Sequence, residues 1–304
     1  MKLKNKYDKK YKILQLDGGG LKGVIFLVLL VALEEALKKP CYKIFNLVIG
    51  TSTGGITATA IANGYSAKYV LNMYIKNAKR IFNRRLFGYL NPASWFTGAT
   101  YKRKFVDNLV KDMFKLPMNK LKCGLIVTGV NMRDALSTHY FKSYKKKYKN
   151  VVSCYPVMAT YSAPTYFGYF NDKKDYLLSM NKKGGVWADG GVGVENCTLL
   201  QAYIESQRLG NKKNYWILSC GTGYTGLCEI KQGLFSQIKS FIPIAREQAV
   251  QMQVSHCREL KINFTRADII IKKVHNEMDK PKYINNYLQY GRILSKSILA
   301  NIFK

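Results

Sequence analysis

The stretch Gly50-Thr51-Ser52-Thr53-Gly54-Gly55 decides the fold prediction, because it joins two segments of different character. It follows the apolar run 44–49, which is typical of a buried strand, and it precedes 56–62, which has a helical composition. A serine with a glycine two positions away on each side, at a strand-to-helix junction, is typical of a nucleophile elbow. Such a turn tolerates only hydrogen at the flanking Cα positions and presents the hydroxyl near a helix N-terminus. Ser52 is therefore the candidate nucleophile, and the alternative is an ordinary glycine-rich turn.

A second glycine-marked junction lies upstream, at Asp17-Gly18-Gly19-Gly20-Leu21-Lys22-Gly23. Residues 11–16 before it predict a strand, and residues 24–37 after it predict a helix that Pro40 ends. Together with the strand and helix around Ser52, this order predicts an α/β fold with a largely parallel sheet.

The remaining segments continue the alternation of strands and helices. Expected strands are 123–130, 176–178, 185–188 and 215–220, and expected helices are 65–79, 105–114, 152–162 and 198–208. We expect a single domain over 1–304, with a core at about 11–225 and a helical C-terminal extension at about 232–304.

The first glycine loop also fits the dinucleotide pattern Gly18-x-Gly20-x-x-Gly23. That interpretation needs an acidic residue after the second strand to hold the ribose, and no Asp or Glu occurs between Ala36 and Val106. Consecutive glycines at a helix N-terminus can instead point bare backbone N–H groups at one spot, as an oxyanion hole requires.

Composition limits the class of protein. With 304 residues, 47% hydrophobic and 22% charged, the chain has the composition of a globular protein and is long enough for a large core. The formal net charge of +31 has two explanations: a biased composition, or an anionic partner such as a membrane surface or nucleic acid. The acid-free span from Ala36 to Val106 makes the region around Ser52 especially cationic.

Cysteine usage and hydropathy predict the setting. Seven cysteines without a CxxC pair argue against a disulfide framework and a zinc site, and indicate a reducing compartment. The basic N-terminus has no apolar signal core, and the longest apolar run, Val24 to Leu33, is about half of a membrane span. We expect a cytoplasmic protein that can associate peripherally with membranes. No carboxylate cluster has a metal-ligand spacing, so neither a metal nor a cofactor is expected.

The glycine junctions, in this order, resemble those of the patatin-like phospholipase family over about residues 13–223. Besides the two motifs quoted above, the resemblance includes Ser162-Ala163-Pro164-Thr165-Tyr166-Phe167, Asp189-Gly190-Gly191-Val192 followed by Glu195-Asn196, and Gly221-Thr222-Gly223. Cys197 and Gly168 stand where the family often has proline, which leaves substrate preference open.

The resemblance implies a three-layer patatin-like fold, with a central, mainly parallel sheet flanked by helices. It also implies a serine-dependent lipid acyl hydrolase of the phospholipase A type, which cleaves fatty acyl esters of glycerophospholipids through an acyl-serine intermediate. The family's serine and aspartate dyad corresponds to Ser52 and Asp189, and its oxyanion hole to the backbone N–H groups of Gly18, Gly19 and Gly20. Lys22 occupies the family's basic position and is expected near the substrate phosphate. Asp17 is expected to be a structural hydrogen-bond acceptor.

Several alternatives stay open from the sequence. A triad of Ser52, Asp189 and either His256 or His275 would follow the α/β-hydrolase order, whereas His139 is expected to be structural. The expected partner is a phospholipid or membrane surface and not nucleic acid, and the sequence does not give the oligomeric state. The alternative function is a non-catalytic basic module that binds anionic membranes or nucleic acid.

Aromatic residues mixed with arginines at 80–98 suggest either a mobile cap or a surface helix and loop.

Overall fold

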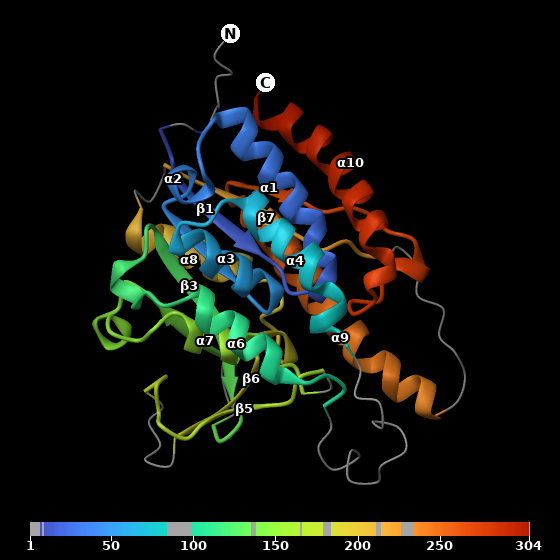
Figure 1. Ribbon diagram of the computed structural model, residues 1–304. Helices are drawn as coiled ribbons and strands as arrows, with labels where there is room; N and C mark the ends of the chain where they lie inside the picture. The colour runs from blue at the N-terminus through green and yellow to red at the C-terminus, as the bar shows by residue number, and fades with distance from the viewer. Residues whose placement is uncertain are drawn as a thin grey trace.

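The computed structural model of the chain describes residues 7, 9–83, 99–134, 138–164, 166–178, 184–210, 214–225 and 234–303, and only the backbone of 234–243. Most of the segment 80–98, from residue 84 onward, therefore lies outside the described residues. The described part of the chain forms one mixed β-sheet with helices packed on both faces (Figure 1). The predicted α/β class, with a central sheet flanked by helices, is confirmed.

The sheet has eight strands in the part of the chain that the structure describes, in the order β5-β6-β3-β2-β1-β7-β8, with β4 also paired to β3. The run β3-β2-β1-β7-β8 is parallel, and the pairings of β4 and β6 with β3 and of β5 with β6 are antiparallel. The strands are β1 (Tyr11–Leu16), β2 (Leu47–Gly50), β3 (Gly124–Asn131), β4 (Thr138–Lys142), β5 (Phe170–Asp172), β6 (Gly185–Asp189), β7 (Tyr215–Cys220) and β8 (Phe264–Ala267).

The helices connect and cover these strands. The described α-helices are α1 (Val24–Leu37), α2 (Cys41–Ile44), α3 (Thr53–Asn63), α4 (Ala67–Ile81), α6 (Arg103–Met113), α7 (Cys154–Thr160), α8 (Leu199–Leu209), α9 (Leu234–Glu259) and α10 (Ile284–Ile302). None of the helices in the described ranges is long and apolar enough to cross a bilayer.

Alternation along the strands divides the core between the two faces of the sheet. Successive side chains of a strand point to opposite faces. Ile13 and Ile217 accordingly pack with residues of α8 and α9, whereas their neighbours Leu14 and Leu218 pack with α1, α3, α4 and α10. Burial on both faces explains why apolar residues occur at successive positions of these strands, such as Ile13 and Leu14 of β1 and Ile217 and Leu218 of β7.

Strand register brings the glycine junctions to one edge of the sheet. Leu16 at the end of β1 pairs with Gly50 of β2 on one side and with Cys220 of β7 on the other. On β3, Val127 pairs with Gly50 and Gly129 pairs with Asp189. The carboxyl ends of β1, β2, β6 and β7 therefore meet in one region, although β6 runs antiparallel to β3.

Two segments differ from the sequence prediction. Residues 176–178, predicted as a strand, form a turn, because the Asp172 carboxylate accepts hydrogen bonds from the N–H groups of Tyr176 and Leu177 at 3.0 and 2.8 Å. The region expected to be helical beyond residue 232 also contributes β8, which extends the sheet next to β7. Its following helix, α10, packs along α1 (Figure 1). Gly291 permits this close approach, since a Cβ there would lie 2.7 Å from the carbonyl oxygen of Ile25.

Candidate active site

Ser52 sits in a strained turn between β2 and α3. Its φ and ψ angles are 55° and −123°, a conformation that costs a residue with a side chain about 1–3 kcal/mol. The flanking glycines permit this turn: a Cβ on Gly50 would lie 2.4 Å from the backbone of Gly54, and one on Gly54 would lie 2.2 Å from the carbonyl oxygen of Leu16. The local geometry is that of a nucleophile elbow, as the glycine spacing predicts.

Asp189 ends β6 beside this elbow. Ser52 and Asp189 line the same cavity, and the Ser52 hydroxyl is close enough to the Asp189 carboxylate to lower its pKa. The carboxylate also accepts a hydrogen bond from the N–H of Gly191 at 2.8 Å. The backbone of each residue is held independently: the N–H of Ser52 donates to the Thr160 hydroxyl at 2.8 Å, and that of Asp189 to the carbonyl of Ser162 at 3.0 Å. The structure therefore brings the two predicted residues together from segments far apart in the sequence.

Burial changes the acidity of Asp189. Asp189 is only 5% exposed, and desolvation of its carboxylate raises its pKa from 3.8 to about 6. The nearby Ser52 hydroxyl, the hydrogen bond from Gly191 and the charge of Arg246 act in the opposite direction and limit the rise of the pKa. The carboxylate is thus a stronger base than an exposed aspartate and is still ionised at neutral pH.

The first glycine loop faces the same point. A Cβ on Gly18 would lie 3.2 Å from the Cβ of Ser52, so this loop passes directly beside the serine. The N–H of Gly18 is already used, since it donates to the carbonyl of Asn196 at 3.1 Å. Within the described ranges, the N–H groups of Gly19 and Gly20 have no such acceptor. The row of three donors expected from the sequence is thereby narrowed to these two.

Lys22 does not lie where a substrate phosphate was expected. It is 3% exposed, and its Nζ donates to the side-chain oxygen of Asn276 at 2.7 Å and to the carbonyl of Gly223 at 3.2 Å. Desolvation, with a smaller contribution from Arg246, lowers its pKa to about 7. Lys22 joins the glycine loop to the C-terminal region and does not line the cavity described below.

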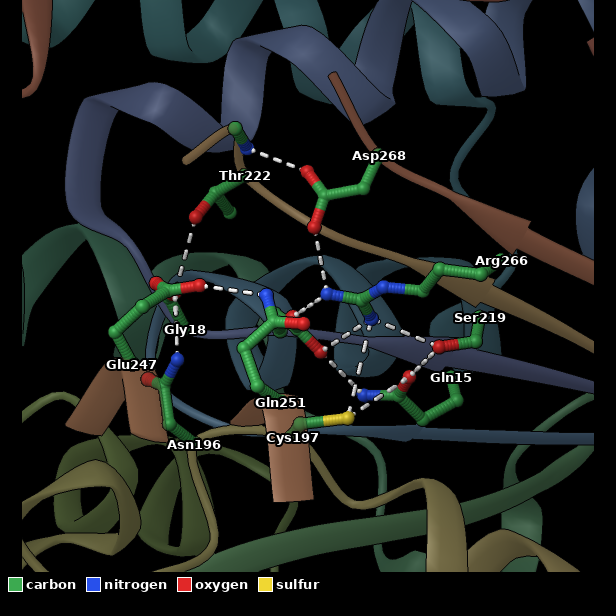
Figure 2. Close-up of polar contacts among 12 residues, drawn as sticks. Gln15, Gly18, Asn196, Cys197, Ser219, Thr222, Glu247, Gln251, Arg266 and Asp268 are labelled. Atoms are coloured by element: carbon green, nitrogen blue, oxygen red, sulfur yellow. Dashed lines mark hydrogen bonds and ion pairs between the residues drawn. The ribbon is translucent and has the colours of Figure 1, made fainter. Parts of the chain in front are cut away.

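An ion-pair cluster under the glycine loop was not predicted from the sequence. Arg266 of β8 donates to Asp17 at 2.6 Å and to Asp268 at 2.7 Å, and the exposed fractions of the Arg266, Asp17 and Asp268 side chains are 10%, 4% and 12%. Figure 2 shows the Arg266 guanidinium directed at Asp268 and at the hydroxyl of Ser219. Asp268 in turn accepts from the N–H of Gly223 at 2.9 Å. Asp17 is the structural acceptor that was predicted, and Arg266 is the partner that the sequence did not reveal.

A cavity of about 310 Å³ opens from the elbow. Its inner part is apolar and lies between α3, α4 and α6, with side chains such as Ile56, Met73, Tyr74, Val106, Val110 and Phe114. Its polar end contains the Ser52 and Asp189 side chains, the backbone of Gly19 and Gly20, and Arg246 of α9. A long apolar group can therefore enter the cavity with a polar group beside Ser52.

The histidines lie elsewhere. His256 is exposed on α9, and His275 is hydrogen-bonded through Nδ1 with the hydroxyl of Tyr290 at 3.0 Å. Neither lines the cavity. His139 lies on β4 with its ring edge against Trp187. In the described ranges, no three His, Cys, Asp or Glu side chains are grouped so that they could hold a metal ion.

Comparison with known proteins identifies the family. The sequence model described as patatin-like phospholipase matches residues 14–203, which is more than half of the chain. The chain belongs to the patatin-like phospholipase family. The match contains both the Ser52 elbow and Asp189, and the central sheet with helices on both faces agrees with the fold that the resemblance implied.

Several curated relatives of this patatin-like chain are named as phospholipases. A cUMP-AMP-activated phospholipase of Escherichia coli is 42% identical over 26% of this chain and 24% of its own length. A cGAMP-activated phospholipase of Pseudomonas aeruginosa is 29% identical over 60% of this chain and 53% of its own. An 85/88 kDa calcium-independent phospholipase A2 of Rattus norvegicus is 32% identical over 43% of this chain and 15% of its own. The matched region thus spans about half or less of each of these relatives.

Proposed function

We propose that the protein is a serine-dependent lipid acyl hydrolase of the phospholipase A type, which cleaves fatty acyl esters of glycerophospholipids. One observation carries this proposal: three groups lie together at the polar end of a largely apolar cavity. They are the hydroxyl of Ser52, whose backbone is strained, the buried carboxylate of Asp189, and the N–H groups of Gly19 and Gly20, which have no backbone acceptor in the described ranges. Membership of the patatin-like phospholipase family supports the same class of reaction.

The first half of the reaction forms an acyl-enzyme. As the Ser52 oxygen attacks the ester carbonyl carbon, Asp189 accepts the hydroxyl proton. The N–H groups of Gly19 and Gly20 stabilise the tetrahedral oxyanion, an effect worth about 3 kcal/mol or more per donor. The bond to the leaving alcohol then breaks, the lysophospholipid oxygen takes the proton from Asp189, and the acyl group remains on Ser52.

The second half releases the fatty acid. Water attacks the acyl carbonyl while Asp189 accepts its proton, and the proton then returns to the Ser52 oxygen as the ester bond breaks. The acyl chain occupies the apolar part of the cavity throughout, which keeps the carbonyl carbon beside Ser52.

The test is fatty acid release from phospholipid vesicles. We expect Ser52→Ala and Asp189→Asn each to lower turnover by at least about 1,000-fold, and His256→Ala to leave it unchanged, because His256 is remote from the cavity. The wild-type kcat/KM should fall below about pH 6, since protonated Asp189 cannot act as the base.

A chemical probe gives an independent readout. A fluorophosphonate should label wild-type protein at Ser52 and leave Ser52→Ala unlabelled. Substantial turnover by Ser52→Ala or Asp189→Asn would contradict the dyad, and absence of both labelling and turnover in the wild-type protein would favour a non-catalytic binding module.

A further inference from the structure

Arg246 is unusual among the residues of the active-site cavity. It lies on α9, its side chain is partly buried, and in the described ranges it and Asp189 are the two charged residues that line the cavity. The two charges share the polar end of the cavity with Ser52, and the remaining wall is mostly apolar.

The guanidinium of Arg246 has little to bind within the described part of the chain. Its one hydrogen bond there runs from Nη1 to the sulfur of Met278 at 3.0 Å, and no carboxylate forms an ion pair with it. A thioether is a weak acceptor, whereas a guanidinium carries five N–H donors. Most of the N–H donors of Arg246 therefore have no protein acceptor in the described ranges.

The acidic residues near α9 and the Met278 segment have other partners. Glu247 accepts a hydrogen bond from Gln251 at 2.9 Å, a contact that Figure 2 shows. Glu277 pairs with Lys280 at 3.2 Å, and Asp279 accepts from the Tyr101 hydroxyl at 2.5 Å. Each of these carboxylates thus has a partner other than Arg246.

A partly buried guanidinium that forms no direct ion pair is costly, and an anionic ligand in contact with it would reduce that cost. A guanidinium binds phosphate oxygens in a bidentate manner, with charge-assisted hydrogen bonds. In a glycerophospholipid, the phosphate and the scissile esters are attached to the same three-carbon unit. If the ester of such a lipid lies at Ser52 and its acyl chain occupies the apolar part of the cavity, its phosphate lies at the polar end of the same cavity, near Arg246.

We propose that Arg246 binds the phosphodiester of the lipid head group and makes the enzyme select phospholipids over neutral acylglycerols. This assignment rests on the proposed acyl hydrolase function, and it gives Arg246 the role that the sequence suggested for Lys22.

The experiment compares two dispersed short-chain substrates with the same acyl chains, phosphatidylglycerol and diacylglycerol, so that recruitment to a membrane does not affect the result. We expect Arg246→Ala to lower kcat/KM for phosphatidylglycerol by about 10- to 100-fold and for diacylglycerol by less than about threefold. Arg246→Lys should recover part of the phospholipid activity, because it restores the charge without the planar fork. Arg258→Ala, which removes the same charge from an exposed position of the same helix, should match the wild type.

A binding measurement keeps this test separate from that of the hydrolase. Diether analogues of the two lipids cannot be hydrolysed, and titration calorimetry should show that wild-type protein prefers the phosphate-containing ether and that Arg246→Ala does not. An equal loss on both substrates would mean that Arg246 acts on Asp189 or the oxyanion and would overturn the proposal, as would a preserved phosphate preference in Arg246→Ala. If the wild-type protein hydrolyses neither ester, the proposed function fails, and the ether titration still decides the role of Arg246.

Discussion

At the scale of single residues, Asp189 lies in a buried environment that favours the neutral form of its carboxyl group over the charged form. Burial raises its pKa from 3.8 to about 6, which corresponds to about 3 kcal/mol between the charged and neutral forms. Below pH 3.8 the group is protonated in the folded and unfolded chain alike, and the cost is absent. The cost develops as the pH rises and is complete above about pH 6, where the folded protein carries the buried charge.

We therefore expect Asp189→Asn to remove activity and to stabilise the fold. At pH 8 its free energy of unfolding should exceed that of the wild type by on the order of 1–3 kcal/mol, and the difference should shrink toward zero at pH 4. Urea unfolding at the two pH values measures this. Asp112→Asn, an exposed change on α6, should alter stability by less than about 0.5 kcal/mol. A gain in stability that did not depend on pH would contradict the explanation by desolvation.

At the scale of elements, β8 supports the glycine loop through Arg266. Burial opposes the charge of this residue, but its ion pairs with Asp17 and Asp268 raise its pKa well above the ordinary value. Removing one member of such a buried cluster leaves the charges of the other members without an opposite charge. This lowers stability far more than replacing all members by neutral residues.

Arg266→Met should accordingly lower the free energy of unfolding by about 3–5 kcal/mol. The same change made together with Asp17→Asn and Asp268→Asn should cost much less, since no buried charge is then left unpaired. Chemical denaturation of the single, double and triple variants measures the coupling. Arg258→Met, on the exposed side of α9, serves as the matched control and should be neutral. Equal costs in both backgrounds would show that the ion pairs do not stabilise the loop.

Elements with strong local patterns were predictable from the sequence, and elements defined by distant contacts were not. β1, α1 and β7 have the predicted bounds, because mainly apolar segments next to glycine-rich turns and a clear helix stop specify them locally. The prediction of a strand at 176–178 was wrong. The Asp172 side chain stabilises a turn there through hydrogen bonds, and the apolar composition of the segment does not reveal such bonds. β8 is four residues long and exists through its pairing with β7, so no local signal indicated it.

The candidate site divides in the same way. Glycine spacing at Ser52 and the motif at Asp189 were visible along the chain, and the sheet register brings them together. Arg246 and Arg266 lie in a region without a motif, and their relevance appears only in the folded chain, where Arg246 lines the cavity and Arg266 binds Asp17. Lys22 was predicted to lie near the substrate, but it is buried. A position in a motif does not tell whether a side chain faces a cavity or the protein interior.

At the scale of the whole molecule, the net charge of +31 should govern access to membranes. Surface charges attract anionic lipids over a distance that salt shortens, whereas salt hardly screens the buried pair proposed as the catalytic dyad. We expect fatty acid release from vesicles rich in anionic lipid to fall at least several-fold between about 0.05 and 0.5 M NaCl. Release from a dispersed short-chain ester should change by less than about twofold. A parallel decline of both activities would indicate an effect of salt on the catalytic site and not on membrane binding.

The glycine loop near the start of the chain is completed by residues near its other end. Met278 accepts a hydrogen bond from the N–H of Leu21 at 2.8 Å, Asn276 binds Lys22, and Arg266 binds Asp17. During translation, Ser52 is made early and these supporting residues are made late. A nascent chain therefore carries Ser52 for much of its synthesis without the contacts that hold the glycine loop in place, so the proposed hydrolase can become active only after this region has been translated.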